Sequence, residues 1–393
     1  MVSNFVIPKD QKKVTDCRIE QQIGIVDLFR KKERFTVKQP FTPISLLPVN
    51  NLNKNNNIGV LFTVEWAIYL KHLGYTNLSV ITLESDPYIQ KICSLWKFNY
   101  IILNNHKGIM KFDTIIGNPP YNKNLITKNH PVYNHPAMNS EKEGYIGFFI
   151  QSLELLKPNG KLIFLTPGKF MMGAGTKNFR EWVSKNYDLV SIEAKNPSIF
   201  ETVGLDSLVV TTIINKPYSG ITRVTDINQK SVIMDYTKNK DYIIPNLGDQ
   251  QLFDDYNKVT DFVINWTCHT VGDYGPKFKS NFSDIQTTVH THPVCMKIEN
   301  NLPVITYTNL QSNHQSVNQW RVITNLSFSN DFAVLPPGIE LAYNKYGIAF
   351  NSEQEARDFY NWTQTDKWKK LWAGLNSTRH THVVIRNMPK YPI

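Results

Sequence analysis

Four consecutive residues, Asn118-Pro119-Pro120-Tyr121, combine the groups that can hold a planar molecule by an exocyclic amine. The prolines fix their own φ near about −65° and keep the residues before them out of the helical region. This rigid stretch presents the amide of Asn118, the carbonyl of Pro119 and the ring of Tyr121. Two acceptors match the two hydrogens of an NH2 group, and a planar ring can stack on the tyrosine. The alternative is an ordinary proline-rich turn with a buried tyrosine.

The motif resembles the catalytic motif of amino-methyltransferases. These enzymes use S-adenosylmethionine (SAM) to methylate the exocyclic amine of adenine or cytosine in DNA, or related amides. In the sequence the motif follows the apolar run 112–116, which predicts a buried strand. The resemblance implies catalytic roles for Asn118, Pro119, Pro120 and Tyr121, and does not by itself choose the acceptor.

The elements that would carry this motif alternate between strand and helix along residues 41–216. Asp86 and Pro87, for example, favour the start of a helix. Such alternation predicts a parallel sheet with helices on both faces, which binds its ligands at the carboxyl ends of the strands. Together with the resemblance, the fold class is α/β, a Rossmann-like SAM-dependent methyltransferase sheet domain. The predicted strands are 44–49, 78–83, 100–103, 112–116, 161–165, 189–194 and 208–214.

Candidate cofactor residues follow the second and third predicted strands. Glu84 ends the second, where a carboxylate can accept from both hydroxyls of a ribose. The order of these elements resembles the gamma-type N6-adenine DNA methyltransferases of restriction-modification systems. That resemblance implies that Glu84 binds the ribose of SAM and that Asn105, with Asn104 beside it, contacts its adenine. A solvated strand end is the alternative for Glu84.

One stretch departs from this family. The loop after the first strand is expected to be glycine-rich, so that its backbone can wrap the methionine part of SAM. We assign this loop to residues 50–59, where asparagines dominate and Gly59 is the only glycine. Asparagine adopts left-handed conformations more readily than most residues. A working loop with Gly59 at the cofactor is therefore one interpretation, and a degenerate SAM site is the other.

The resemblance extends to residues that would touch the substrate. In the family a phenylalanine near the end of this domain stacks on the flipped adenine opposite the tyrosine, and Phe200 occupies that place. Lys169, in the stretch Thr166-Pro-Gly-Lys-Phe170, is a second candidate for substrate binding. An ordinary core phenylalanine is the alternative for Phe200.

The alternation stops after residue 216, which predicts the methyltransferase catalytic domain at 41–216 and a further domain at 217–393. The residues before the catalytic domain, 1–40, are predicted to form an N-terminal helical arm. Short β-rich runs and two final helices, the first opened by a capping box of Ser352 and Glu355, indicate an α+β fold for the last part. By resemblance this part is a target-recognition domain. Candidate phosphate or base contacts are Lys277, Lys279, Lys367, Lys369, Lys370, Arg379 and Arg386.

Composition agrees with an enzyme that acts on nucleic acid. The net charge is +10, which suits a polyanionic partner. The four cysteines are far apart and the histidines lack a ligand pattern, so we expect no metal site. The N-terminal residues show no apolar h-region typical of a signal peptide, and the sequence has no apolar run of about 18 residues. We therefore expect no membrane partner, and a place in the cytoplasm of a bacterial or phage-infected cell.

The sequence thus predicts a site-specific DNA adenine N6-methyltransferase that transfers a methyl group from SAM to a flipped-out adenine of double-stranded DNA. A separate restriction endonuclease is a candidate partner. Two alternatives stay open. One is methyl transfer to RNA or to a protein glutamine, and the other is a catalytically weak or inactive methyltransferase-like protein that binds DNA or regulates a partner.

Overall fold

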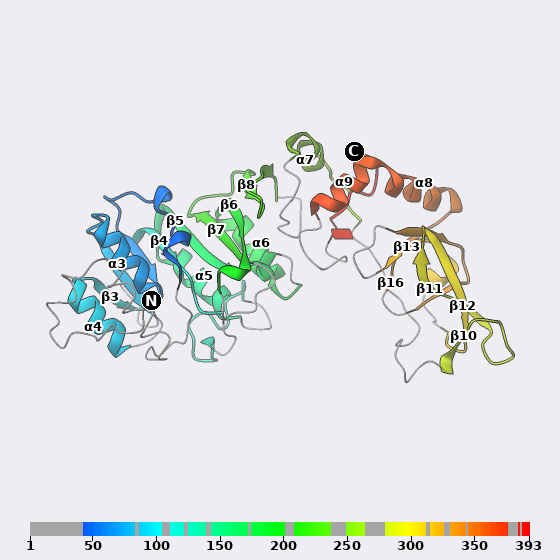
Figure 1. Ribbon diagram of the computed structural model, residues 1–393, viewed down its shortest axis with the longest axis horizontal. Coiled ribbons are helices and arrows are strands. Elements are labelled where there is room, and N and C mark those ends of the chain that lie inside the picture. The colour runs from blue at the N-terminus through cyan, green and yellow to red at the C-terminus, as the bar shows by residue number, and fades with distance from the viewer. Residues whose placement is uncertain are drawn as a thin grey trace, which may run out of the picture. The chain divides into compact units, whose positions relative to one another are not determined.

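The chain forms two compact units in a computed structural model (Figure 1). The first unit comprises residues 1–229 with 235–242, and the second comprises 230–234 with 243–393. The residues that the structure describes are 42–82, 86–103, 111–121, 125–138, 143–171, 174–200, 208–236, 249–263, 280–311, 315–325, 331–342, 345–375, 384–385 and 387–393.

A large sheet organises the first unit. Its described strands in this unit are β1 (Ile58–Leu61), β2 (Leu78–Thr82), β3 (Asn99–Ile102), β4 (Phe112–Gly117), β5 (Leu156–Pro167), β6 (Asp188–Lys195), β7 (Leu208–Ile214) and β8 (Thr222–Thr225). They follow the order β3-β2-β1-β4-β5-β7-β6-β8, and β9 (Ser231–Met234) belongs to residues 230–234 of the second unit. β1 pairs in parallel with both β2 and β4, so the strand order reverses between β1 and β4. β7 runs antiparallel to both β5 and β6.

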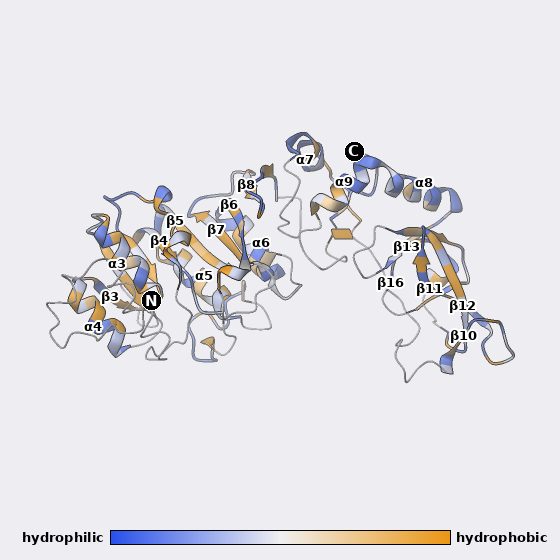
Figure 2. Ribbon diagram, viewed as in Figure 1, coloured by the Kyte–Doolittle hydropathy of each residue, from blue (hydrophilic) through white to orange (hydrophobic). Residues whose placement is uncertain are grey.

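Helices cover both faces of this sheet, as the alternation of elements predicted. Neighbouring residues of β5 point to opposite faces, so they report which helix covers which side. Ile163 and Leu165 lie in one apolar cluster with residues of α3 (Val64–His72) and α4 (Pro87–Trp96). Phe164 instead packs on Phe149 of α5 (Gly144–Glu154), which in turn contacts Phe179 of α6 (Lys177–Asn186). The strands between these layers are mostly hydrophobic (Figure 2).

Helix α4 begins where the sequence predicted. The Asp86 carboxylate accepts from the backbone N–H groups of Tyr88 and Ile89, both at 3.0 Å, and Pro87 is the first helical residue. These bonds satisfy two of the donors that a helix N-terminus leaves without partners. The face of this helix that carries Ile89, Ile92, Cys93 and Trp96 is buried.

The predicted first strand was wrong. Residues 44–49 form two short 3-10 helices, η1 (Ile44–Leu46) and η2 (Val49–Asn51), and the true strand β1 is Ile58–Leu61. Pro43 precedes this run and Pro48 lies inside it, and proline lacks the N–H that a strand interior needs. The run still belongs to the core, because Leu46 and Leu47 are buried beside α3 and α4. The sheet also extends past residue 216, since β8 pairs in parallel with β6.

The second unit contains two smaller sheets. One has the order β10-β12-β11-β15 and the other the order β14-β13-β16. Two helices, α8 (Glu353–Gln364) and α9 (Asp366–Leu375), follow these sheets in the chain, and Trp362, Trp368 and Trp372 pack with Phe332 and Phe359. The strands are β10 (Phe282–Ser283), β11 (His292–Glu299), β12 (Leu302–Thr308), β13 (Trp320–Asn325), β14 (Phe332–Leu335), β15 (Glu340–Leu341) and β16 (Lys345–Phe350).

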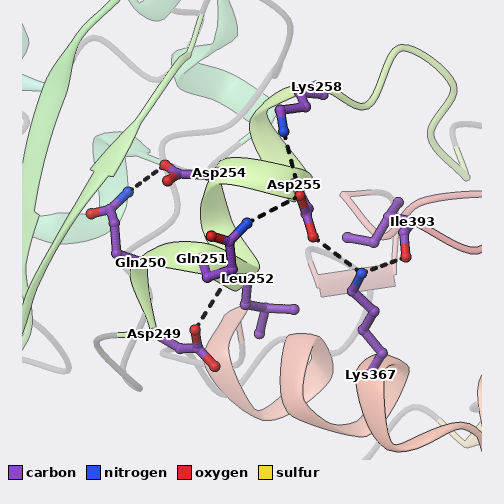
Figure 3. Close-up of polar contacts among 9 residues, drawn as sticks. All are labelled: Asp249, Gln250, Gln251, Leu252, Asp254, Asp255, Lys258, Lys367 and Ile393. Atoms are coloured by element: carbon purple, nitrogen blue, oxygen red, sulfur yellow. Dashed lines mark hydrogen bonds and ion pairs between the residues drawn. The ribbon is translucent and has the colours of Figure 1, made fainter.

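The capping box of α8 is confirmed. The hydroxyl of Ser352 accepts from the backbone N–H of Glu355 at 3.2 Å, and the Glu355 carboxylate accepts from the N–H of Asn351 at 3.0 Å. Elsewhere in this unit, α7 (Gln250–Asn257) is tied to α9 by a side-chain contact shown in Figure 3. The Nζ of Lys367 lies 3.2 Å from Oδ2 of Asp255, and this hydrogen bond is the main reason that the pKa of Asp255 is lowered.

Within the described ranges, every helix is too short or too polar to cross a bilayer.

Candidate active site

The motif predicted to be catalytic lies at the carboxyl end of β4, beside β1. This is where the strand order reverses, and open α/β sheets bind their ligands in the crevice at such a point. Gly117 allows the close approach of the two strands. A Cβ at this position would lie 2.5 Å from the carbonyl oxygen of Leu61, nearer than real side chains come. The missing side chain therefore brings Asn118 next to the end of β1.

Asn118 is fixed on both edges of its amide. The side chain is buried, with 1% of the residue exposed. Its Nδ2 donates to Oγ1 of Thr42 at 3.1 Å, and its Oδ1 accepts from the hydroxyl of Tyr121 at 2.5 Å. Pro119 and Pro120 are buried as well, so the motif is a rigid part of the core rather than a surface turn. The oxygen edge of the amide faces the tyrosine.

Tyr121 presents a half-buried ring beside this amide. Its ring packs edge-on against Tyr145 on α5, with centroids 6.3 Å apart and an interplanar angle of 87°. Burial raises the pKa of the Tyr121 hydroxyl above its ordinary value of about 10, so the group stays a neutral hydrogen-bond donor at physiological pH. The ring and the amide together can hold a planar group that carries an NH2 substituent.

Lys169, a predicted substrate-binding residue, follows β5 and forms an ion pair. Its Nζ lies 2.7 Å from Oε1 of Glu143, the residue that precedes α5. The Glu143 side chain is only 6% exposed, whereas that of Lys169 is 53% exposed. The lysine therefore neutralises a buried carboxylate, and about half of its own side chain stays exposed at the same edge of the sheet. No sequence pattern indicates the contact of Glu143 with Lys169.

Phe200, predicted to stack on the substrate, is buried in the apolar cluster that includes Leu208 and Val210. Only 5% of the residue is exposed. The structure thus places it in the core beside β7, the surroundings of an ordinary packed phenylalanine. Its stacking role stays a prediction.

The cofactor residues were only partly located. Glu84, Asn104 and Asn105 lie outside the described residues. Gly59 is described, and it is not in a loop. It sits inside β1, where an added Cβ would lie 2.7 Å from Cδ1 of Ile81, so its role is close packing between strands. The assignment of Gly59 to a cofactor loop was wrong because the first strand had been placed too early in the chain.

The true connection from β1 to α3 is only Phe62 and Thr63. Phe62 adopts a φ of 62°, is 2% exposed and packs against Phe148. Thr63 is fully buried, and its hydroxyl donates to the carbonyl of Leu61 at 3.3 Å rather than capping the helix. A tight turn without glycine does not fit the glycine-rich loop that the resemblance calls for at the methionine part of SAM. The described residues fit the acceptor side of the reaction better than the cofactor side.

Two further residues at this crevice were missed by sequence reasoning. Thr42 and Glu65 are both fully buried, and the backbone N–H of Thr42 donates to Oε1 of Glu65 at 2.8 Å. The signal for Glu65 was available, because it is an acid among apolar residues in the first turn of α3. No sequence pattern indicates its contact with Thr42.

The segment between the motif and α5 is not only polar. Ile126 and Val132 are buried, and both lie within 3.2 Å of the position that a Cβ on Gly147 of α5 would take. Ile126 and Val132 of this segment therefore pack on α5.

The sheet order, the antiparallel β7 and the position of the motif define the class of protein. The first unit has the α/β fold of the SAM-dependent methyltransferases, as the sequence predicted. Within that class, residues 40–200 match the model of the Eco57I restriction-modification methylase family. This segment of the chain is therefore similar to restriction-modification methylases.

Two curated type II methyltransferases are similar to this chain. The chain is 25% identical over 277 residues to the type II methyltransferase M.HindII of Haemophilus influenzae strain Rd, covering 65% of this chain and 52% of the relative. It is 26% identical over 218 residues to M.HincII of Haemophilus influenzae, covering 52% and 42%. The chain thus spans about half the length of the curated relatives it matches.

One solved structure with a similar fold is the modification subunit of a putative type I restriction enzyme from Vibrio vulnificus YJ016. The TM-score is 0.44 at 14% sequence identity, with 61% of this chain and 56% of that chain covered.

Proposed function

We propose that this chain methylates the N6 amine of adenine in double-stranded DNA, with SAM as the methyl donor. The observation that carries the proposal is the position of the motif Asn118-Pro119-Pro120-Tyr121. The motif forms a buried, rigid ledge at the carboxyl end of β4, where the strand order reverses. The match to restriction-modification methylases supports DNA as the acceptor, and the net charge of +10 agrees with a polyanionic substrate.

The chain's residues would act by positioning the amine. The target atom lies inside the duplex, so the base must be flipped out at a cost of a few kcal/mol. The two acceptors would be Oδ1 of Asn118, which also accepts from Tyr121, and the carbonyl of Pro119. With the two amine hydrogens held by these atoms, the nitrogen lone pair turns out of conjugation with the ring and becomes nucleophilic. Pro120 keeps the ledge rigid, which serves catalysis by orientation.

Direct transfer needs no nucleophile from the protein. Among the described cysteines, Cys93 and Cys295 are both buried, and burial raises the pKa of Cys93 to about 12 and that of Cys295 to about 11. Both thiols are therefore protonated at neutral pH and unreactive. Neither of these two thiols is therefore a candidate nucleophile.

SAM, when bound, supplies an electrophilic methyl group. We propose that Glu84 holds its ribose and that Asn105 and Asn104 contact its adenine. The glycine-free turn at Phe62 and Thr63 lacks the close backbone contact that a glycine-rich loop would make with the methionine part of SAM. We therefore expect the chain to bind SAM more weakly than an enzyme with a glycine-rich loop. We also propose Phe200 as the second stacking face for the flipped adenine and Lys169 as a contact to substrate.

We propose that the C-terminal part, from about residue 217 onward, recognises the DNA target, and that the N-terminal 40 residues form an arm. Among the predicted phosphate contacts that the structure describes, Lys369 and Lys370 are exposed, whereas Lys367 pairs with Asp255. Lys369 and Lys370 are therefore the better candidates. A separate restriction endonuclease as partner and a cytoplasmic location are further parts of this proposal.

A panel of acceptors tests the proposal. The purified chain is incubated with labelled SAM and with duplex DNA, single-stranded RNA or a glutamine-containing protein extract, and label transfer is measured for each. Transfer to duplex DNA alone is the expected result. Transfer to RNA or protein would mean that DNA is not the acceptor. Tight DNA binding without transfer to any acceptor would favour the non-catalytic alternative, and the glycine-free turn is the feature that favours this alternative.

A further inference from the structure

A chain of hydrogen bonds ties the proposed catalytic amide to two residues far from it in sequence. Asn118 donates from Nδ2 to Oγ1 of Thr42 at 3.1 Å. The N–H of Thr42 donates to Oε1 of Glu65 at 2.8 Å. Thr42 and Glu65 are each 0% exposed, so neither contact competes with bulk water. Because the three residues belong to different segments, the bonds connect β4, helix α3 and the stretch before β1.

The stretch that carries Thr42 is held by consecutive residues of α3. Besides the bond to Glu65, the indole N–H of Trp66 donates to the carbonyl of Pro43 at 3.3 Å. Glu65 lies in the first turn of α3, where the helix dipole stabilises a carboxylate. A carboxylate without exposed surface is costly unless hydrogen bonds satisfy it. The contact with Thr42 is therefore part of what permits an acid at this buried position.

These contacts define how the Asn118 amide is presented. With Nδ2 bound to Thr42 and Oδ1 bound to Tyr121, neither edge can rotate without breaking a buried hydrogen bond. Productive geometry in a reacting site must be held within about 0.5 Å, and supporting residues outside the reacting atoms provide that restraint.

We propose that Thr42 and Glu65 are positioning residues of the amine-acceptor site. Thr42 holds the plane of the Asn118 amide so that Oδ1 faces the incoming amine, and Glu65 holds Thr42. This inference rests on the proposed function, since it assigns the purpose of the restraint to methyl transfer from a donor to an exocyclic amine.

The test begins with three substitutions, each of which changes a single group of a buried threonine. Thr42→Val keeps the branched shape and removes the hydroxyl, whereas Thr42→Ser keeps the hydroxyl and removes the methyl group. Thr63→Val is the matched control, because Thr63 is equally buried at the start of α3 but its hydroxyl bonds to Leu61. For each variant, kcat and KM for duplex DNA are measured together with thermal unfolding.

Thr42→Val should lower kcat about ten-fold with KM for DNA changed less than about two-fold, and Thr42→Ser should recover most of the rate. Thr63→Val should lose a similar amount of stability without this selective loss of kcat. Glu65→Met should behave like Thr42→Val, and Glu65→Gln, which keeps an oxygen acceptor, should be milder. Equal losses of kcat and stability in the valine variants of Thr42 and Thr63 would overturn the proposal, because they would indicate that Thr42 serves the stability of the fold alone.

A second readout does not depend on methylation. In protein labelled with ¹⁵N-asparagine, the side-chain NH2 signal of Asn118, assigned by its loss in Asn118→Ala, should exchange slowly with solvent. Exchange should stay slow in Thr42→Ser and become fast in Thr42→Val. If the wild type methylates nothing but shows this pattern, the proposed function fails and the restraint stands. If it methylates DNA and Thr42→Val leaves kcat and exchange unchanged, the restraint fails and the function stands.

Discussion

Substitutions of Tyr121 separate the two tasks proposed for this side chain. Its hydroxyl donates to the buried amide of Asn118 at 2.5 Å, and its ring is oriented edge-on by Tyr145. Tyr121→Phe removes only the hydroxyl, a net loss of about 1 kcal/mol, which corresponds to a roughly five-fold lower rate. Tyr121→Ala also removes base stacking of about 1–3 kcal/mol, so it should be slower by a further factor of about 5 to 150.

The assay is the initial rate of methyl incorporation from labelled SAM into mixed-sequence duplex DNA, measured over a range of DNA concentrations. The phenylalanine variant should lose kcat, and the alanine variant should lose both kcat and affinity for DNA. Since burial raises the pKa of Tyr121, its hydroxyl remains a donor at alkaline pH. The ratio of wild-type to phenylalanine rates should therefore stay constant between about pH 7 and pH 9.

Two outcomes would refute this account of the ring and the hydroxyl. Equal rates for the phenylalanine and alanine variants would mean that the ring is not a stacking platform. A phenylalanine variant as fast as the wild type would mean that the hydroxyl does not help to hold Asn118.

Three further substitutions test how the fold supports the site. Gly117→Ala should destabilise the protein by about 1–3 kcal/mol and lower methylation, because the new Cβ would meet the Leu61 carbonyl at 2.5 Å; an unchanged midpoint in urea would contradict this. Asp113 has a pKa lowered mainly by its hydrogen bond with Lys157, so its contribution to stability is present above about pH 4 and is lost as pH falls through the lowered pKa. Melting temperatures measured downward from pH 5 should therefore fall more steeply for the wild type than for Asp113→Asn. Asp86→Ala should cost about 1–2 kcal/mol by removing the cap of α4, and a thermal melt that matches the wild type would argue against the cap.

Much of the first unit could be predicted because its signals are local. The cap at Asp86 and the proline that follows it mark the start of α4 within one turn, and the motif marks the end of β4. Residues of this kind act on their immediate neighbours, so their effect does not depend on the rest of the fold.

Strand β1 could not be found in the same way. It has only four residues, Ile58-Gly-Val-Leu61, all buried on both faces, so it shows neither length nor alternation. The longer apolar run at 44–49 offered a stronger pattern, although its prolines exclude a central strand. Because the first strand was predicted at 44–49, Gly59 was assigned to a loop and the short turn at Phe62 was not predicted.

The restraint on Asn118 was also beyond the sequence. Thr42 and Glu65 meet it through side-chain hydrogen bonds that depend on how three separate segments come together. Propensity and periodicity predict elements, and they do not predict which polar side chains converge once those elements are packed. The same applies to Glu143 and Lys169.

The central claim is tested most directly by one measurement of the methylated product. The purified chain is incubated with SAM and mixed-sequence duplex DNA, the DNA is digested to nucleosides, and N6-methyladenine is measured by mass spectrometry beside an Asn118→Ala control. We predict N6-methyladenine with the wild type and its loss in the control. Methylation of another base, or no methylation at a SAM concentration of about 1 mM, would contradict the account.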